Sequence, residues 1–205
     1  MYERESSVPA RIGIAYYDAA DEQLAPSRGE LPSRWRHSSA EVPEELIAKF
    51  RPRQQYIGQL ETLAALCCPL SRPAQFRGRQ VIHFIDNSGA LFGMSKGYMR
   101  DIDSARLVHV FHSLCAALQT QVWFEFVPSG ANLADQPSRD DFALLAELGS
   151  TPFPTVWPDV GAGWHDAFEH IFDKFAPRPS KAEKRARRAV DDAIEGERAK
   201  RARFA

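Results

Sequence analysis

Three acidic side chains stand at places in the sequence where a catalytic site could use them. Asp86 directly follows the apolar run 81–85, Glu61 lies within an otherwise apolar helical segment, and Asp135 lies in the polar loop 132–139. Carboxylates that come together are suited to binding a hard divalent cation, because such ions prefer oxygen ligands. Taken one at a time, each acid also has an ordinary structural interpretation.

Those ordinary interpretations differ for the three residues. Asp86 is followed by Asn87 and Ser88, so it could cap a turn or a helix. Glu61 could simply face water from its helix, and Asp135 could brace its own loop by accepting backbone N–H groups. The pattern that the three acids make together is therefore more informative than any one of them.

The elements that would position these acids follow from hydrophobic periodicity and from turn residues. Strands are predicted at 11–18, around Trp35 and His37, at 81–85 and at 122–127; helices are predicted at 41–50, 54–68 (ended by Pro69), 88–94 (closed by Lys96-Gly97), 101–119 and 140–148. The almost wholly apolar run 81–85 favours a central strand that is covered on both faces. Strands that alternate with helices predict an α/β domain with a mixed sheet.

A Glu within a helix, an Asp after a strand and an Asp in a loop follow one another here as Glu61, Asp86 and Asp135. This arrangement resembles that of the ribonuclease H family, and most closely that of the RNase H-like domains attached to reverse transcriptases of retroelements. The resemblance is carried by Ile57-Gly-Gln-Leu-Glu61, by Phe84-Ile-Asp86-Asn87-Ser-Gly-Ala90, and by Val127-Pro-Ser-Gly-Ala-Asn132-Leu-Ala-Asp135-Gln-Pro-Ser-Arg139. The last motif is the most specific, and together they cover roughly residues 11–148.

The resemblance implies an RNase H-like fold, a mixed five-stranded sheet flanked by helices. It implies hydrolysis of the RNA strand of an RNA–DNA hybrid, beside a reverse transcriptase domain in a parent polyprotein. By the same resemblance Glu61, Asp86 and Asp135 are the catalytic residues and the ligands of Mg²⁺ or Mn²⁺. Two such ions can activate a water molecule and stabilise the departing oxygen of a phosphodiester.

One part of the family pattern has no counterpart in the sequence. The family opens with a strand whose Asp is the central metal ligand, whereas the first strand predicted here, with its early Gly13, matches the family's second strand. We therefore expect a domain truncated at its first strand, with weakened metal binding and weak or absent nuclease activity. Asp18 is a possible replacement ligand, although no hairpin follows it. The alternative is a catalytically dead, nucleic-acid-binding remnant of a reverse transcriptase polyprotein.

Other polar residues give weaker signals. Lys96, Arg100 and Arg106 could meet a phosphate backbone, as could Asn87 and Arg139 beside the acids, although a solvated helix face explains the basic residues equally well. The pairs His109/His112 and His165/His170 lack the further ligands of a zinc site. The three cysteines, Cys67, Cys68 and Cys115, indicate a reducing compartment, nuclear or cytoplasmic, rather than a disulfide framework.

The formal charge of −1 over 205 residues conceals an uneven distribution. Residues 178–205 carry ten Lys and Arg against five Asp and Glu, which leaves sixteen basic and twenty-two acidic residues in the rest of the chain. We expect an RNase H-like domain over 1–149, a Pro-rich linker over 150–163, an amphipathic helix over 164–176, and a basic, partly helical or disordered tail over 177–205. The sequence shows neither a basic-then-apolar leader nor an apolar run long enough to cross a membrane.

Overall fold

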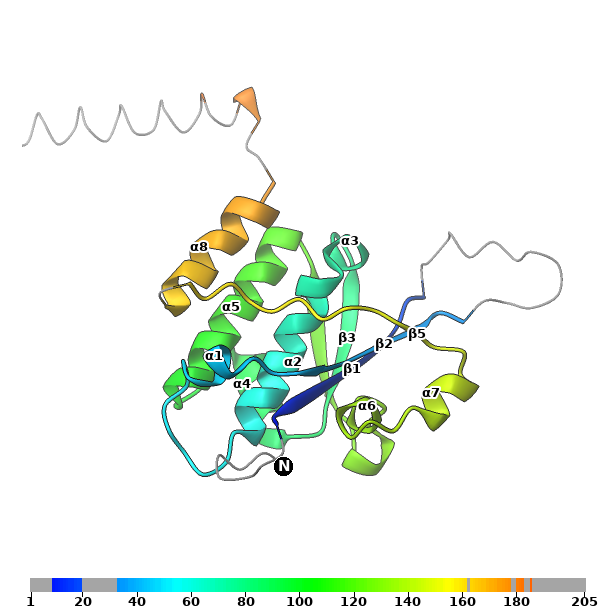
Figure 1. Ribbon diagram of the computed structural model, residues 1–205. Coiled ribbons are helices and arrows are strands. Elements are labelled where there is room, and N and C mark those ends of the chain that lie inside the picture. Colours follow the sequence, from blue (N-terminus) through cyan, green and yellow to red (C-terminus); the bar gives the residue numbers. More distant parts are fainter. Residues whose placement is uncertain (1–8, 20–32, 162, 178–179, 183–184, 186–205) are drawn as a thin grey trace, which may run out of the picture. The chain divides into compact units, whose positions relative to one another are not determined.

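A computed structural model describes residues 9–19, 33–161, 163–177, 180–182 and 185, and shows a mixed α/β architecture (Figure 1). In chain order the elements are β1 (Arg11–Tyr17), β2 (Trp35–Glu41), α1 (Glu44–Ile47), α2 (Ile57–Ser71), α3 (Pro73–Phe76), β3 (Gln80–Ile85), α4 (Ser88–Lys96), α5 (Ile102–Leu118), β4 (Gln121–Phe126), η1 (Ser129–Ala131), α6 (Asp135–Ser138), α7 (Ala143–Glu147), β5 (Thr151–Pro152) and α8 (Trp164–Phe175).

The first sheet has the strand order β1-β2-β5. β1 and β2 are antiparallel over their whole length, from Arg11 opposite Glu41 to Tyr17 opposite Trp35. The short β5 adds to β2 in parallel. Along β1, Ile12 and Ile14 alternate with more exposed residues and point into the core, as the period of two requires of a strand with one buried face.

The second sheet consists of β3 and β4, which are parallel and pair from Gln80 with Gln121 to Ile85 with Phe126. The strand that the apolar run 81–85 predicted is present, but its two faces are not both covered. Ile82 and Phe84 are 61% and 57% exposed, whereas Ile85 is buried. The expectation of one continuous mixed sheet therefore needs correction: the described residues form five strands in two separate sheets.

Helices α2, α5 and α8 pack side by side, α2 on α5 and α5 on α8 (Figure 1). Their shared core contains Leu63, Leu66, Leu107, Phe111 and Leu114, each at most 1% exposed. The prediction that Pro69 ends α2 was wrong, because the helix continues to Ser71 with Leu70 buried. Burial of the last turn outweighs the loss of one backbone donor at Pro69. Gly97, by contrast, does close α4, in the left-handed conformation.

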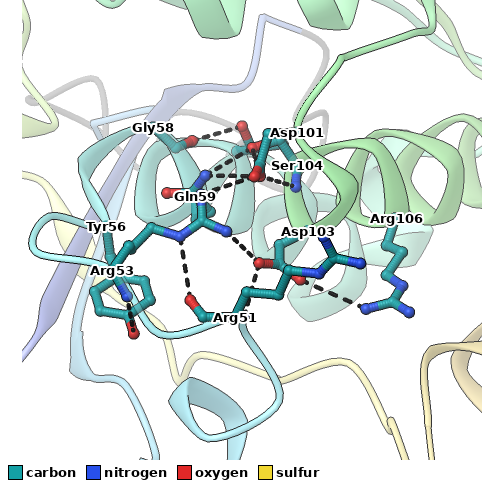
Figure 2. Close-up of polar contacts among 10 residues, drawn as sticks. Arg51, Arg53, Tyr56, Gly58, Gln59, Asp101, Asp103, Ser104 and Arg106 are labelled. Carbon is teal, nitrogen blue, oxygen red and sulfur yellow. Dashed lines mark hydrogen bonds and ion pairs between the residues drawn. The ribbon is translucent and has the colours of Figure 1, made fainter.

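A network of charged groups ties α2 to the start of α5 (Figure 2). Arg53 pairs with Asp101 at 2.8 Å and also with Asp103, whose side chain is fully buried. The Gln59 amide donates to Asp101 and to Ser104, both at 2.9 Å. Burial pushes the pKa of Asp101 upward, but hydrogen bonds from Ser104, Gln59 and Arg53 outweigh it and bring the pKa to about 2. These contacts fix the first turns of α2, which carry Glu61.

The segment expected to be a linker runs along the domain instead. Phe153 is buried, its N–H donates to the His37 carbonyl at 2.9 Å, and the Ser38 and Thr155 hydroxyls are 2.6 Å apart. The predicted amphipathic helix is present as α8, with Trp164 stacked on Phe50 at 5.8 Å between ring centroids. Residues 176–205 form a separate unit, and most of the predicted basic tail lies outside the described residues.

None of the helices in the described part of the chain is long and apolar enough to cross a lipid bilayer.

Candidate acidic site

The three acids come from three different elements. Glu61 lies in the second turn of α2, Asp86 directly follows β3, and Asp135 opens the short helix α6. All three line a single cleft of about 1370 Å³ between β1 and β3. The structure therefore brings together residues that are up to 74 positions apart in the sequence, from Glu61 to Asp135.

Glu61 has the most unusual electrostatics of the three. Burial, and then the negative charges of Asp86 and Asp135, raise its pKa to about 7. A hydrogen bond from Asn87 lowers the pKa but does not cancel this rise. Its Oε2 atom is buried and has no hydrogen-bond partner among the described residues. An ionised carboxylate in this position is poorly compensated by the protein itself.

The pKa of Asp135 is also shifted by its surroundings in the cleft. Burial and the charge of Asp86 raise its pKa, whereas Arg139 lowers it. One carboxylate oxygen accepts a long hydrogen bond from Asn132 at 3.5 Å, and the other pairs with the exposed Arg139 at 3.3 Å. Arg139 was predicted to contact nucleic acid; in the structure its described ion pair is with Asp135.

The loop that carries Asp135 is held against β1. Gly13 lies so close to this loop that a β-carbon added there would be 2.1 Å from the Ala134 carbonyl oxygen and 2.7 Å from the Ser138 nitrogen. Within the loop, the Asn132 side chain accepts from the Ala134 N–H, and the Ser138 hydroxyl donates to the Asp135 carbonyl. The sequence motif from Asn132 to Arg139 therefore shapes a compact turn whose position depends on the absence of a side chain at residue 13.

The donor set at this end of the cleft consists of the carboxylates of Glu61, Asp86 and Asp135. Its chemistry suits Mg²⁺, since it consists of carboxylate oxygens, one of them buried and unpartnered. In the described part of the chain, no three His, Cys, Asp or Glu side chains are arranged as a complete ligand group for a metal ion. The cluster is thus electrostatically coupled without being a formed metal site.

The other predicted site residues have different surroundings. Asn87 caps α4, its side-chain oxygen accepting from the Ala90 N–H at 3.0 Å. The Lys96 ammonium lies over the Phe92 ring at 5.8 Å, and Arg100 is exposed. Asp18 directly follows β1, and the charges that raise the pKa of Glu61 are those of Asp86 and Asp135.

The remaining candidates are the histidines and cysteines, which lie in the core or nearer the surface. His83 is the clearest case, because it packs against Phe111 and Phe124 and burial lowers its pKa to about 4. All three cysteines are buried and free. The Arg53–Asp101–Asp103 network was missed; its signal in the sequence was the pair Asp101 and Asp103 at the start of a long helix, where Asp101 is a typical N-cap residue.

No family model matches this chain, and no match was found among curated proteins or solved structures.

Proposed function

We propose that this chain is an RNase H-like domain of the retroelement type, and that Glu61, Asp86 and Asp135 form a weak binding site for Mg²⁺ or Mn²⁺ at the end of its central cleft. The observation that supports this proposal is that the charges within this group of acids raise the pKa values of Glu61 and Asp135. The same three acids were selected from the sequence motifs alone. Like charges held together without other compensation are costly unless a cation neutralises them.

The chemistry of the proposed site is phosphodiester hydrolysis on a nucleic acid, in relatives the RNA strand of an RNA–DNA hybrid. A bound divalent ion would supply an activated water and would stabilise the leaving oxygen. The protein's own contribution is to hold three carboxylates from α2, β3 and α6 at one end of a cleft. Because these acids do not form a complete ligand set, we expect weak metal binding and little cleavage.

A non-catalytic role in binding nucleic acid is the second candidate. It is favoured by the absence of a group of three metal-ligating side chains within the described residues. The two candidates differ in whether the acids bind a divalent cation. In both, the chain would bind a nucleic acid and would belong to a reverse transcriptase polyprotein.

Calorimetric titration with Mn²⁺ and Mg²⁺ tests the proposal without relying on activity. Binding should be detected for the parent chain and should weaken about tenfold or more in Asp86→Asn, because one charged ligand is lost. Glu147→Gln is the matched control, since Glu147 is an exposed carboxylate outside the cleft. Equal affinities for all three proteins would reject the metal site.

A cleavage assay on an RNA–DNA hybrid with Mg²⁺ then addresses the enzyme. We expect little product from the parent chain. Robust cleavage that is abolished by Asp86→Asn would show that the site is complete, and would overturn the expectation of a weakened one.

A further inference from the structure

The cleft that contains the acids is bordered on both sides by strand edges. Every residue of β1 and every residue of β3 lines it. β1 has β2 on one side and β3 has β4 on one side, and no strand of the described residues pairs with either of them across the cleft.

The hydrogen-bond register shows which backbone groups of β1 face this cleft. The Val42 N–H donates to the Ala10 carbonyl, and the Asp18 N–H donates to the Arg34 carbonyl. In an antiparallel pair the bonded residues alternate, so the even-numbered residues from 10 to 18 bond to β2. The N–H and C=O groups of Arg11, Gly13, Ala15 and Tyr17 therefore point toward the cleft.

The same reasoning applies to β3. The Gln121 N–H donates to the Arg79 carbonyl, and the Val127 N–H donates to the Ile85 carbonyl. In this parallel pair the odd-numbered residues of β3 consequently bond to β4, which leaves Gln80, Ile82 and Phe84 with backbone groups directed away from it. Within the described part of the chain, no backbone partner is found for these groups.

The floor of the cleft also suits an extended chain. It is formed by α2, which presents Leu60, Ala64 and Cys68 there, so that small and apolar side chains meet whatever lies between the strands. Exposed strand edges of this kind are templates for pairing with another strand. At the carboxyl end of β3 the lining of the cleft becomes acidic, with Glu61 from α2, Asp86 after β3 and Asp135 from α6.

We propose that this cleft binds an extended peptide segment of a partner polypeptide, which pairs with β1 and β3 at once and joins the two sheets into one. The partner segment is apolar on the face toward α2 and carries a Lys or Arg at the residue beside Asp86, where the carboxylates of Glu61, Asp86 and Asp135 supply the complementary charge. Main-chain hydrogen bonds give such strand addition its affinity, and the side chains of alternate residues give it specificity.

The inference is independent of the proposed nuclease function, because it rests on strand edges and on charge in the metal-free protein. A strand in this position would pair on both sides, whereas addition at the outer edge of β4 would pair on one side only. The test must therefore distinguish the cleft from that outer edge.

The experiment measures binding of fluorescent peptides of about eight residues, long enough to span either strand edge, by anisotropy in EDTA with the full chain. The peptides alternate Val and Thr and carry Lys at either the amino or the carboxyl end. We expect at least one Lys peptide to bind. The corresponding Asp peptide should bind about tenfold more weakly, because its carboxylate is repelled by the acidic residues at that end of the cleft.

Two matched variants locate the binding site. Ile82→Pro removes an N–H that points into the cleft, whereas Phe126→Pro removes one from the outer edge of β4, and the register places neither N–H in the β3–β4 pairing. Ile82→Pro should weaken binding about tenfold and Phe126→Pro should leave it unchanged. Circular dichroism checks that both variants are folded.

A second measurement keeps the test decisive if either variant fails to fold. Residue-resolved hydrogen exchange on the parent chain should show that peptide protects the amides of Gly13, Ala15, Ile82 and Phe84 together. Absence of binding by either Lys peptide, protection of one strand only, or a larger loss with Phe126→Pro would overturn the proposal.

Discussion

At the scale of single residues, Glu61 is the side chain whose state depends most on its surroundings. Its pKa is raised to about 7 in the folded protein by burial and by two neighbouring carboxylates. In the unfolded chain the same group titrates near its ordinary value of 4.5. Between these two values the folded protein holds a proton that the unfolded chain releases.

This difference predicts a pH dependence of stability with a definite sign. As pH rises from about 4.5 to about 7, the free energy of unfolding should fall, and the loss from this group should be complete above pH 7. Glu61→Gln, which resembles the protonated form, should therefore stabilise the protein at pH 8 and change it little at pH 4.5. Because Glu61 is partly exposed, we expect an effect on the order of 1 kcal/mol, or about 2–4 °C in Tm.

Thermal unfolding of the parent and of Glu61→Gln at both pH values measures this effect, with Glu147→Gln as the control for loss of a surface charge. A stabilisation of the same size at both pH values would contradict it, since the origin would then be packing rather than titration. If the metal proposal holds, adding a divalent cation at pH 8 should make the parent chain more stable than Glu61→Gln, because the variant lacks the carboxylate ligand at residue 61.

At the scale of elements, Gly13 connects β1 to the loop that carries Asp135. A β-carbon at this position would be 2.1 Å from the Ala134 carbonyl oxygen. The Ala134 oxygen belongs to the backbone and an alanine β-carbon has no rotamer of its own, so the overlap cannot be relieved by a change of side-chain rotamer. Gly13→Ala should therefore push α6 away from β1.

We expect Gly13→Ala to lower the free energy of unfolding by about 1–3 kcal/mol, in the range of other overpacked sites. The matched control is Gly58→Ala in α2, where an added β-carbon meets nothing within 4 Å. That control should raise the stability by about 0.5–1 kcal/mol, because alanine favours a helix. Urea denaturation measures both, and a neutral result for Gly13→Ala would show that α6 is not fixed by this contact.

The elements also show how far the sequence alone leads. Periodicity and turn residues predicted β1, α2, β3, α4, α5, β4 and α8, because these signals are local. The helix predicted over 140–148 is present only as the shorter α7, and the loop predicted before it contains the short helix α6. A tight turn at Asp140, with φ of 58°, separates α6 from α7. The packing of Phe153 depends on partners in β2 more than a hundred residues away, and no local pattern contains that information.

Part of the candidate site could likewise be predicted from the sequence and part could not. The motifs selected Glu61, Asp86 and Asp135, and in the structure these three residues line one cleft and the charges of Asp86 and Asp135 raise the pKa of Glu61. The spacing between the carboxylates could not be predicted, since it depends on how α2, β3 and α6 pack. The division of the strands into two sheets is likewise a property of the tertiary fold.

At the scale of the whole molecule, residues 1–175 form one compact unit that includes α8. The helix is bound by its apolar face to α5, and the Arg77 guanidinium donates to the Phe175 carbonyl at 2.9 Å. Ile171 is 2% exposed in this interface, whereas its neighbour Phe172 is 40% exposed and packs against Phe168 on the outer side.

This arrangement predicts that α8 unfolds together with the rest of the domain rather than as a detachable appendage. Ile171→Ala should lower the free energy of unfolding by about 2–5 kcal/mol, because it leaves a cavity between α8 and α5. Phe172→Ala removes a larger side chain but should cost well under half as much, since much of that ring already meets water. The chain has four tryptophans, so both variants are made in a background in which Trp35, Trp123 and Trp157 are replaced by Phe and fluorescence reports Trp164 alone. Urea unfolding followed by this fluorescence and by circular dichroism, which reports all helices, should give coincident transitions in both variants. If Ile171→Ala instead separated the two transitions, with fluorescence changing first, α8 would be a satellite of the fold and the acidic cleft would not depend on it.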